Sequence, residues 1–231
     1  MQEEIKELNP LGYKPIGKLL KSLAIPAIIA NLVNALYNVV DQIFIGQRVG
    51  YLGNAATNIA FPITTICLAI GLTLGIGGAS NFNLELGKGY PEKSKHTAGT
   101  AASTLIIIGI ILCISVRIFL EPLMISFGAT DKILEYSMEY TGITSYGIPF
   151  LLFSIGVNPL VRADGNAKYS MIAIVIGAIL NTILDPLFMF VYNWGIAGAA
   201  WATVISQVVS ALLLLIYFPR FKSVKFSLND F

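Results

Sequence analysis

Two acidic side chains lie inside long apolar stretches of this sequence, and the first of them is Asp41. It follows Asn31, Asn34 and Asn38 at steps of three, four and three residues, so all four side chains share one face of a helix. An ionisable group at membrane depth costs at least about 2.5–3.5 kcal/mol on insertion scales. Hydrogen bonding between helices is the alternative role for such residues, but it explains four successive polar groups less well than one or two. We therefore expect this face to line an aqueous or substrate-binding cavity.

The second acidic side chain, Asp185, follows Asn181 by one helical turn and directly precedes Pro186. The i, i+4 spacing allows Asn181 and Asp185 to meet around one ion or proton. Pro186 lacks an N–H and clashes with the carbonyl of residue 182, so a kink is expected that frees carbonyl oxygens beside the carboxylate. The alternative is a carboxylate near the outer interface, beside the turn at Asn193. Burial of such a carboxylate away from water favours its protonated or cation-bound form.

The elements that position these residues are membrane-spanning helices. The 231 residues are 55% hydrophobic and only 12% charged, against roughly 25% charged in an average soluble domain. A helix crosses the bilayer core with about 20 mostly apolar residues, and six segments qualify: 18–45, 55–86, 97–120, 133–158, 169–192 and 196–218. The predicted fold is therefore an all-α membrane protein with six transmembrane helices.

The distribution of basic residues predicts the orientation of these helices. With a cytoplasmic N-terminus, 12 of the 15 Lys and Arg residues fall on the cytoplasmic side, and Arg48, Arg117 and Lys132 fall outside. By the positive-inside rule both termini are cytoplasmic, in a multi-pass protein of the plasma (cell inner) membrane. We expect residues 1–17 to be a cytoplasmic leader, 18–218 the transmembrane unit, and 219–231 a cytoplasmic tail or the start of a linker. The polar leader and the polar first span argue against a cleavable signal peptide.

Other features indicate packing or bending rather than chemistry. Pro26 lies inside the first span and is expected to act as a hinge. Gly71, Gly75 and Ala79 form a small-xxx-small seam, which allows close helix approach. The sequence contains no nucleophile–base pair, HExxH motif, P-loop or Cys/His cluster, and its two cysteines lack metal-ligand spacing. We expect neither an enzyme nor a bound cofactor, and no nucleic-acid partner.

Several stretches resemble the N-terminal lobe of the multidrug and toxic compound extrusion (MATE) family. They are Gly71–Gly89 (GLTLGIGGASNFNLELGKG), Arg162–Asn166 (RADGN) and Asn181–Gln207 (NTILDPLFMFVYNWGIAGAAWATVISQ), together with Pro26 and Asp41. The likeness covers nearly the whole chain. The last stretch is the most specific, because composition alone would rarely produce its Asn, Asp-Pro and Gly/Ala pattern.

The resemblance implies secondary antiport, in which Na⁺ or H⁺ moves inward and organic, often cationic, compounds move outward. It implies a cation site at Asp41, Asn181, Asp185 and Thr203. Lower-ranked candidates for the substrate cavity are Asn34, Tyr37, Asn38, Asn158 and Gln207. Family members have two six-helix lobes with the cavity between them, so a second lobe, from the same or another chain, is an expected partner together with the bilayer and small organic substrates.

Two other functions stay open. A lipid-linked oligosaccharide flippase or exporter on a similar scaffold is expected to line its lobe with basic groups, whereas the charges recognised here at membrane depth are acidic. A non-transporting half or interaction module is the third possibility. The sequence does not determine the substrate, the choice between Na⁺ and H⁺, the oligomeric state or the presence of a second lobe.

Overall fold

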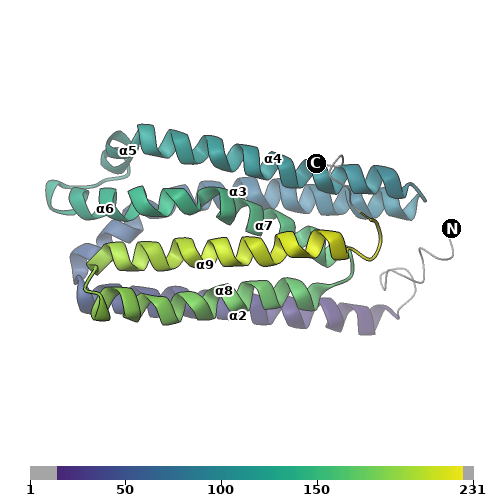
Figure 1. Ribbon diagram of the computed structural model, residues 1–231, viewed down its shortest axis with the longest axis horizontal. Helices are drawn as coiled ribbons and strands as arrows, with labels where there is room; N and C mark the ends of the chain where they lie inside the picture. Colours follow the sequence, from purple (N-terminus) through teal and green to yellow (C-terminus); the bar gives the residue numbers. More distant parts are fainter. Residues whose placement is uncertain (1–14, 226–231) are drawn as a thin grey trace.

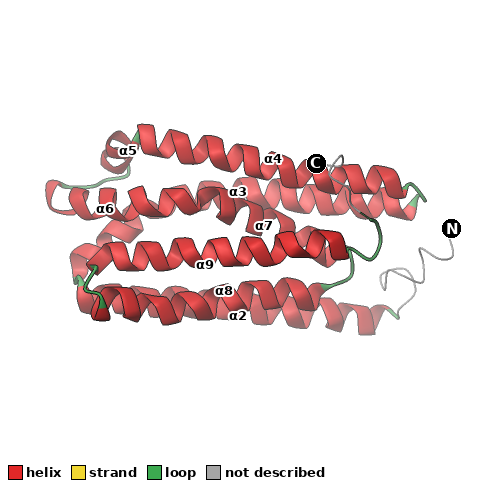
Figure 2. Cartoon of the chain, in the orientation of Figure 1, coloured by secondary structure: helices red, strands yellow, loops and turns green. Residues whose placement is uncertain are grey.

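Apolar stretches of the sequence become long helices that run side by side along one axis (Figure 1). The computed structural model describes residues 15–225, in which helices are joined by short loops and no strand occurs (Figure 2). The helices are α2 (Ile16–Arg48), α3 (Tyr51–Gly87), α4 (Pro91–Ile118), α5 (Leu120–Ser126), α6 (Asp131–Thr144), η2 (Ser145–Gly147), α7 (Ile148–Ala163), α8 (Ala167–Pro186), η3 (Leu187–Val191), α9 (Gly195–Tyr217) and η4 (Phe218–Arg220).

Six helical segments within residues 15–225 are long and apolar enough to cross a membrane, which confirms the predicted fold class. Several begin or end a few residues beyond the predicted limits. Hydropathy detects the part of a helix that suits lipid, whereas the helix itself continues to a residue that breaks it. Gly50 and Gly89, with φ of 85° and 84°, make two such breaks. The start of α2 and the end of α9 lie at the same end of the bundle (Figure 1), the expected cytoplasmic end.

The fourth span differs from the single helix expected over 133–158. It consists of α6 and α7 joined by the 3₁₀ turn η2 at residues 145–147. Pro149 has no N–H to donate to residue 145, so the α-helical hydrogen-bond ladder is interrupted at this point. The backbone here packs closely on α4, where a Cβ on Gly109 would lie 2.6 Å from the Pro149 Cα. The short helix α5, which follows α4, was also not predicted.

The small-residue seam on α3 packs against α7, as its spacing predicted. A Cβ on Gly75 would lie 2.5 Å from the carbonyl oxygen of Gly156, and one on Gly71 would lie 2.7 Å from Ile155 Cγ2. The two helix backbones therefore touch where side chains are missing. Close backbone approach increases van der Waals contact, which drives helix association where lipid removes the hydrophobic effect.

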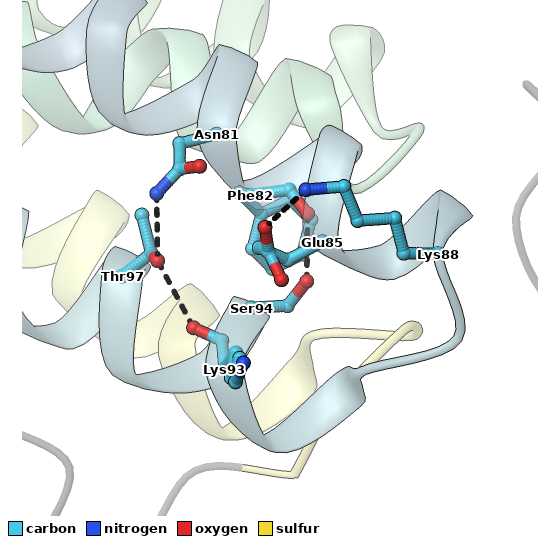
Figure 3. Close-up of polar contacts among 7 residues, drawn as sticks. All are labelled: Asn81, Phe82, Glu85, Lys88, Lys93, Ser94 and Thr97. Carbon is cyan, nitrogen blue, oxygen red and sulfur yellow. Dashed lines mark hydrogen bonds and ion pairs between the residues drawn. The ribbon is translucent and has the colours of Figure 1, made fainter.

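Polar contacts hold α3 and α4 together at the expected cytoplasmic end (Figure 3). Ser94 Oγ donates to the Phe82 carbonyl at 2.6 Å, and Asn81 Nδ2 donates to Thr97 Oγ1 at 3.2 Å. Lys88, which directly follows α3, pairs with Glu85 of that helix at 2.9 Å. The Ser94 bond is buried, so it satisfies two polar groups that water does not reach.

The loop between α7 and α8 holds the chain that follows α9 through the fully buried carboxylate of Asp164. This carboxylate accepts hydrogen bonds from Tyr217 Oη at 2.7 Å and from the backbone N–H groups of Lys222 and Ser223, both at 2.9 Å. Residues 221–225 therefore pack on the lobe, although the sequence suggested only a tail or linker over 219–231. Residues 226–231, and residues 1–14 of the expected leader, lie outside the described range.

Asp164→Ala is expected to lower the free energy of unfolding by about 1–3 kcal/mol, because it leaves buried donors without an acceptor. Asp131→Ala, at the exposed start of α6, is the control and should change stability little. Thermal unfolding in detergent measures both. Equal unfolding temperatures for the two variants would show that the Asp164 contacts do not stabilise the fold.

Candidate cation and substrate site

Two polar side chains of α8 meet one of α9 in the half of the bundle nearer the expected outer end. Asn181 and Asp185 lie one turn apart on α8, and their side chains are 2% and 0% exposed. Asn181 Nδ2 lies 3.4 Å from both Asp185 Oδ1 and Thr203 Oγ1, and it donates to each. The amide thus connects the carboxylate of one helix with the hydroxyl of the next.

Asp41 of α2 completes this group. It is only 7% exposed, and its carboxyl group lies close enough to that of Asp185 for the two groups to interact. Asn38, one turn earlier, bonds instead to Asn34 within α2. The structure therefore brings together all four residues named as the cation site.

The oxygens of this group outnumber the donors available to them. Asp41 Oδ1, Asn181 Oδ1 and Asp185 Oδ2 are buried and have no hydrogen-bond partner. Within residues 15–225, neither carboxylate forms an ion pair with a basic side chain. A buried acceptor without a partner is costly, so the group is suited to a proton or to a small cation that prefers oxygen ligands. Residues 15–225 contain no group of three or more His, Cys, Asp or Glu side chains placed to hold a metal ion.

The backbone changes form directly after Pro186, while the kink and the freed carbonyls expected there stay a prediction. Residues Leu187–Val191 form the π-helical turn η3, and one of its carbonyls is bonded from outside the helix. Arg48, at the end of α2, donates from Nε to the Met189 carbonyl at 3.1 Å and from Nη2 to Asn193 Oδ1 at 2.8 Å. This contact joins the helix that carries Asp41 to the turn that follows Asp185.

Arg48→Met is expected to loosen this end of α8, because two hydrogen bonds from a charged donor are lost. Amide hydrogen exchange in residues 187–194 should become about tenfold faster or more. Arg117→Met is a matched control, since Arg117 also donates to a backbone carbonyl, that of Gly142, at 3.0 Å. It should leave residues 187–194 unchanged, and equal effects of the two variants on that segment would contradict the prediction.

Two cavities lie beside the cation-site residues, and together they are lined by all five residues proposed for substrate contact. A cavity of about 170 Å³ is lined by Asp41, Asn38 and Thr203 among others. A second, of about 210 Å³, is lined by Asn34, Asn158 and Asn181 among others and lies nearer the expected cytoplasmic end. Tyr37 and Gln207 line both cavities, which makes the two spaces neighbours.

A family model described as MatE matches residues 26–187. The chain belongs to the MatE family. The match covers most of the lobe, from the first half of α2 to the turn after Asp185, and it confirms the resemblance identified from the sequence.

The relatives of this MatE lobe include multidrug exporters. The chain is 27% identical over 215 residues to the multidrug export protein MepA of Staphylococcus aureus (strain NCTC 8325 / PS 47), which covers 93% of this chain and 48% of MepA. MepA of Staphylococcus haemolyticus (strain JCSC1435) is 27% identical to the chain over 209 residues, which cover 89% of this chain and 45% of that protein. The chain thus spans about half the length of the curated relatives it matches.

Solved MATE structures match the same lobe. The MATE multidrug transporter DinF-BH in complex with rhodamine 6G has a TM-score of 0.87 and 40% identity, over 92% of this chain and 48% of that chain. An outward-facing multidrug resistance MATE transporter of the MOP superfamily has a TM-score of 0.85 and 29% identity. This match covers 100% of this chain and 50% of that chain. The six helices therefore have the arrangement of one lobe of a MATE transporter.

Several polar residues of the MatE lobe were not recognised as part of the site from the sequence. Tyr140 of α6 lines the cavity beside Asp41, together with Thr203. Arg162 of α7 lines the second cavity. Tyr140 lies in a segment of mixed polar and apolar residues, so only its position in the tertiary structure identifies it. Pro26 lies within the continuous helix α2, and its role as a hinge stays a prediction.

Proposed function

We propose that this chain is the N-terminal lobe of a cation-coupled antiporter that exports organic, mainly cationic compounds across the plasma membrane. The observation that carries the proposal is the buried pair Asp41 and Asp185, which has no basic partner within residues 15–225. No basic side chain neutralises this pair of carboxylates at membrane depth. A proton, a metal cation or a cationic substrate must therefore supply the positive charge.

The three unpartnered oxygens support a proton or Na⁺ as the coupling ion. Asp41 Oδ1, Asn181 Oδ1 and Asp185 Oδ2 come from two helices and are held near one another by the Asn181 and Asp185 contacts. Together with the Thr203 hydroxyl, they form a set of oxygen ligands with two negative charges at most. Such a set suits one or two monovalent cations, which enter and leave as transported ions.

Competition for negative charge provides the coupling in this proposal. When neither H⁺ nor Na⁺ is bound to the carboxylates, the negatively charged cavity beside Asp41 attracts a cationic compound. When H⁺ or Na⁺ binds, that charge is neutralised, the compound is released, and α2 bends at Pro26 so that the cavity shrinks. Rocking of two lobes around the site then alternates access between the two sides of the membrane.

The substrate class rests on the cavities and the relatives. The cavity beside Asp41 combines amide, hydroxyl and phenol groups with apolar side chains such as Ile63 and Phe61. This mixture suits amphipathic molecules of varied shape, because few of its contacts demand one geometry. MepA is named a multidrug export protein, and DinF-BH was solved with rhodamine 6G, so this dye is a suitable first probe.

The proposal is tested with the full-length transporter in proteoliposomes. Rhodamine 6G movement is measured after a Na⁺ gradient, a proton gradient or neither is imposed. Movement driven by one of the two gradients supports the proposal and identifies the coupling ion. Dye movement that depends on neither gradient would contradict the proposal. Vesicles that move no dye but flip a lipid-linked oligosaccharide would also contradict it.

The polar face of α2 leads to a further expectation for the chain expressed alone. Asn31, Asn34 and Asn38 are exposed in the lobe, and the proposal places them in the cleft between two lobes. The isolated chain should therefore self-associate through α2 and α3 or be poorly stable, and it should give no efflux as a monomer. Mass measurement in detergent with drug-susceptibility tests checks this, and a stable monomer that confers resistance would show that six helices suffice.

A further inference from the structure

Arg162 places a positive charge in the cavity that also contains Asn181. The residue lies in the last turn of α7, is partly buried, and lines the second cavity. Its Nε bonds weakly, at 3.4 Å, to the Asn158 carbonyl of its own helix. Within residues 15–225, its guanidinium forms no ion pair with a carboxylate. The five guanidinium N–H groups are thus largely available to a ligand.

The surroundings of Arg162 offer a second donor and no competing acid. Ser154 lies eight residues earlier on α7 and lines the same cavity, and its Oγ is buried without a hydrogen-bond partner. The side chains that line this cavity include amides and hydroxyls of α2, α8 and α9, but no Asp or Glu. Within residues 15–225, no acidic side chain lines this cavity or pairs with Arg162, so its guanidinium is available to an anionic group of a ligand.

The two neighbouring cavities therefore carry opposite charges. Tyr37, Thr203 and Gln207 line both of them, so a ligand in one extends toward the other. Asn31 lines the cavity of Arg162, and ten residues of α2 separate it from Asp41, which corresponds to roughly 15 Å along the helix. That length matches an amphipathic compound with an apolar ring system between two polar ends.

We propose that Arg162, with the Ser154 hydroxyl, binds a carboxylate of the exported compound, while the cationic group of the same compound lies toward Asp41 and Asp185. This inference rests on the proposed export function and names a subsite that distinguishes among its substrates. A guanidinium recognises a planar carboxylate through two parallel hydrogen bonds, which a neutral ester cannot accept equally well.

Two dyes that differ in one group test the subsite in the full-length transporter. Rhodamine 6G is an ethyl ester with a positive charge, and its free acid carries the same cation together with a carboxylate. Binding of each dye in detergent is measured by fluorescence anisotropy, and export is measured in vesicles. Arg162→Gln should weaken binding of the acid about tenfold or more, as expected when a charge-assisted bond is lost, and should change binding of the ester less than twofold.

Control variants separate the subsite from general effects on the protein. Lys168→Gln removes an exposed basic residue at the same end of the bundle and should affect neither dye. Arg162→Lys should recover part of the binding of the acid, and Ser154→Ala should weaken it by a smaller factor than Arg162→Gln. Ser154→Ala also tests the subsite if Arg162→Gln does not fold.

The outcomes are distinguishable from those of the proposed function. If the unmodified transporter exports neither dye, the export function fails. If it exports the ester and Arg162→Gln changes both dyes equally or neither, the subsite is wrong while export stands. Displacement of the acid by phosphatidylglycerol, with no selective effect of Arg162→Gln on acid export, would assign Arg162 to a lipid headgroup and overturn the inference.

Discussion

Asp41→Asn is expected to reduce cation-coupled export to background while the protein stays folded. The amide keeps the size and hydrogen-bonding capacity of the carboxyl group, but it cannot gain or lose charge when a cation binds. Asp41 lies in contact with Asp185, so the variant removes one of the two charges on which competition between cation and compound depends. Gradient-driven dye movement in proteoliposomes and thermal stability in detergent should both be measured.

Two further variants sharpen this test. Asp185→Asn should have a similar effect, and the double variant should be no worse than either single one, because residues that act as a unit are not additive. Asp131→Asn, an exposed carboxylate at the start of α6, should leave export unchanged. Unimpaired coupled export by Asp41→Asn would contradict the coupling role and would indicate that Asp41 serves only as a hydrogen-bonding group between helices.

Gly75→Ala is expected to destabilise the lobe by about 1–3 kcal/mol, the usual cost of inserting a group into a well-packed core. The added Cβ would lie 2.5 Å from the Gly156 carbonyl oxygen and 2.6 Å from the Gly156 Cα. These are backbone atoms, so α3 and α7 must move apart because no flexible side chain can give way. Gly75→Leu should prevent correct packing of the two helices.

Gly77→Ala is the matched control, because Gly77 lies in the same helix and a Cβ there would meet nothing within 4 Å. Alanine favours the helix over glycine by about 0.5–1 kcal/mol, so this variant should be neutral or slightly more stable. Thermal unfolding in detergent, together with the yield of monodisperse protein, measures both. Equal stability of the two variants would show that the α3–α7 contact is looser than the structure indicates.

The sequence by itself determined the features that depend on neighbours along the chain. Helices in lipid satisfy their own backbone hydrogen bonds, so composition and length were enough to predict six spans. The meeting of Asn181 with Asp185 follows from the i, i+4 spacing, whereas the kink expected at Pro186 stays a prediction. The seam at Gly71 and Gly75 was predicted as a packing surface for the same reason, although its partner was not.

The resemblance to the MATE family, rather than spacing, connected Asp41 with Asp185 before the structure did. Sequence patterns placed each aspartate on a polar helix face, but they contained nothing about which faces meet. Thr203 shows the same limit, since a single Thr in a membrane helix is usually a packing residue. The structure brings the side chains of the proposed cation site together, whereas cation binding by them stays a prediction.

Only the tertiary structure decided which helices are neighbours. The helix α2 packs mainly against α8 and much less against α3, the helix that follows it in the chain. This arrangement brings Asp41 to Asp185 and Arg48 to Met189, and the packing of α6 near α9 adds Tyr140. Helix pairing depends on the summed fit of whole surfaces, in which small residues and buried polar groups act together. No local pattern contains that sum, so the site could be predicted residue by residue but assembled only in three dimensions.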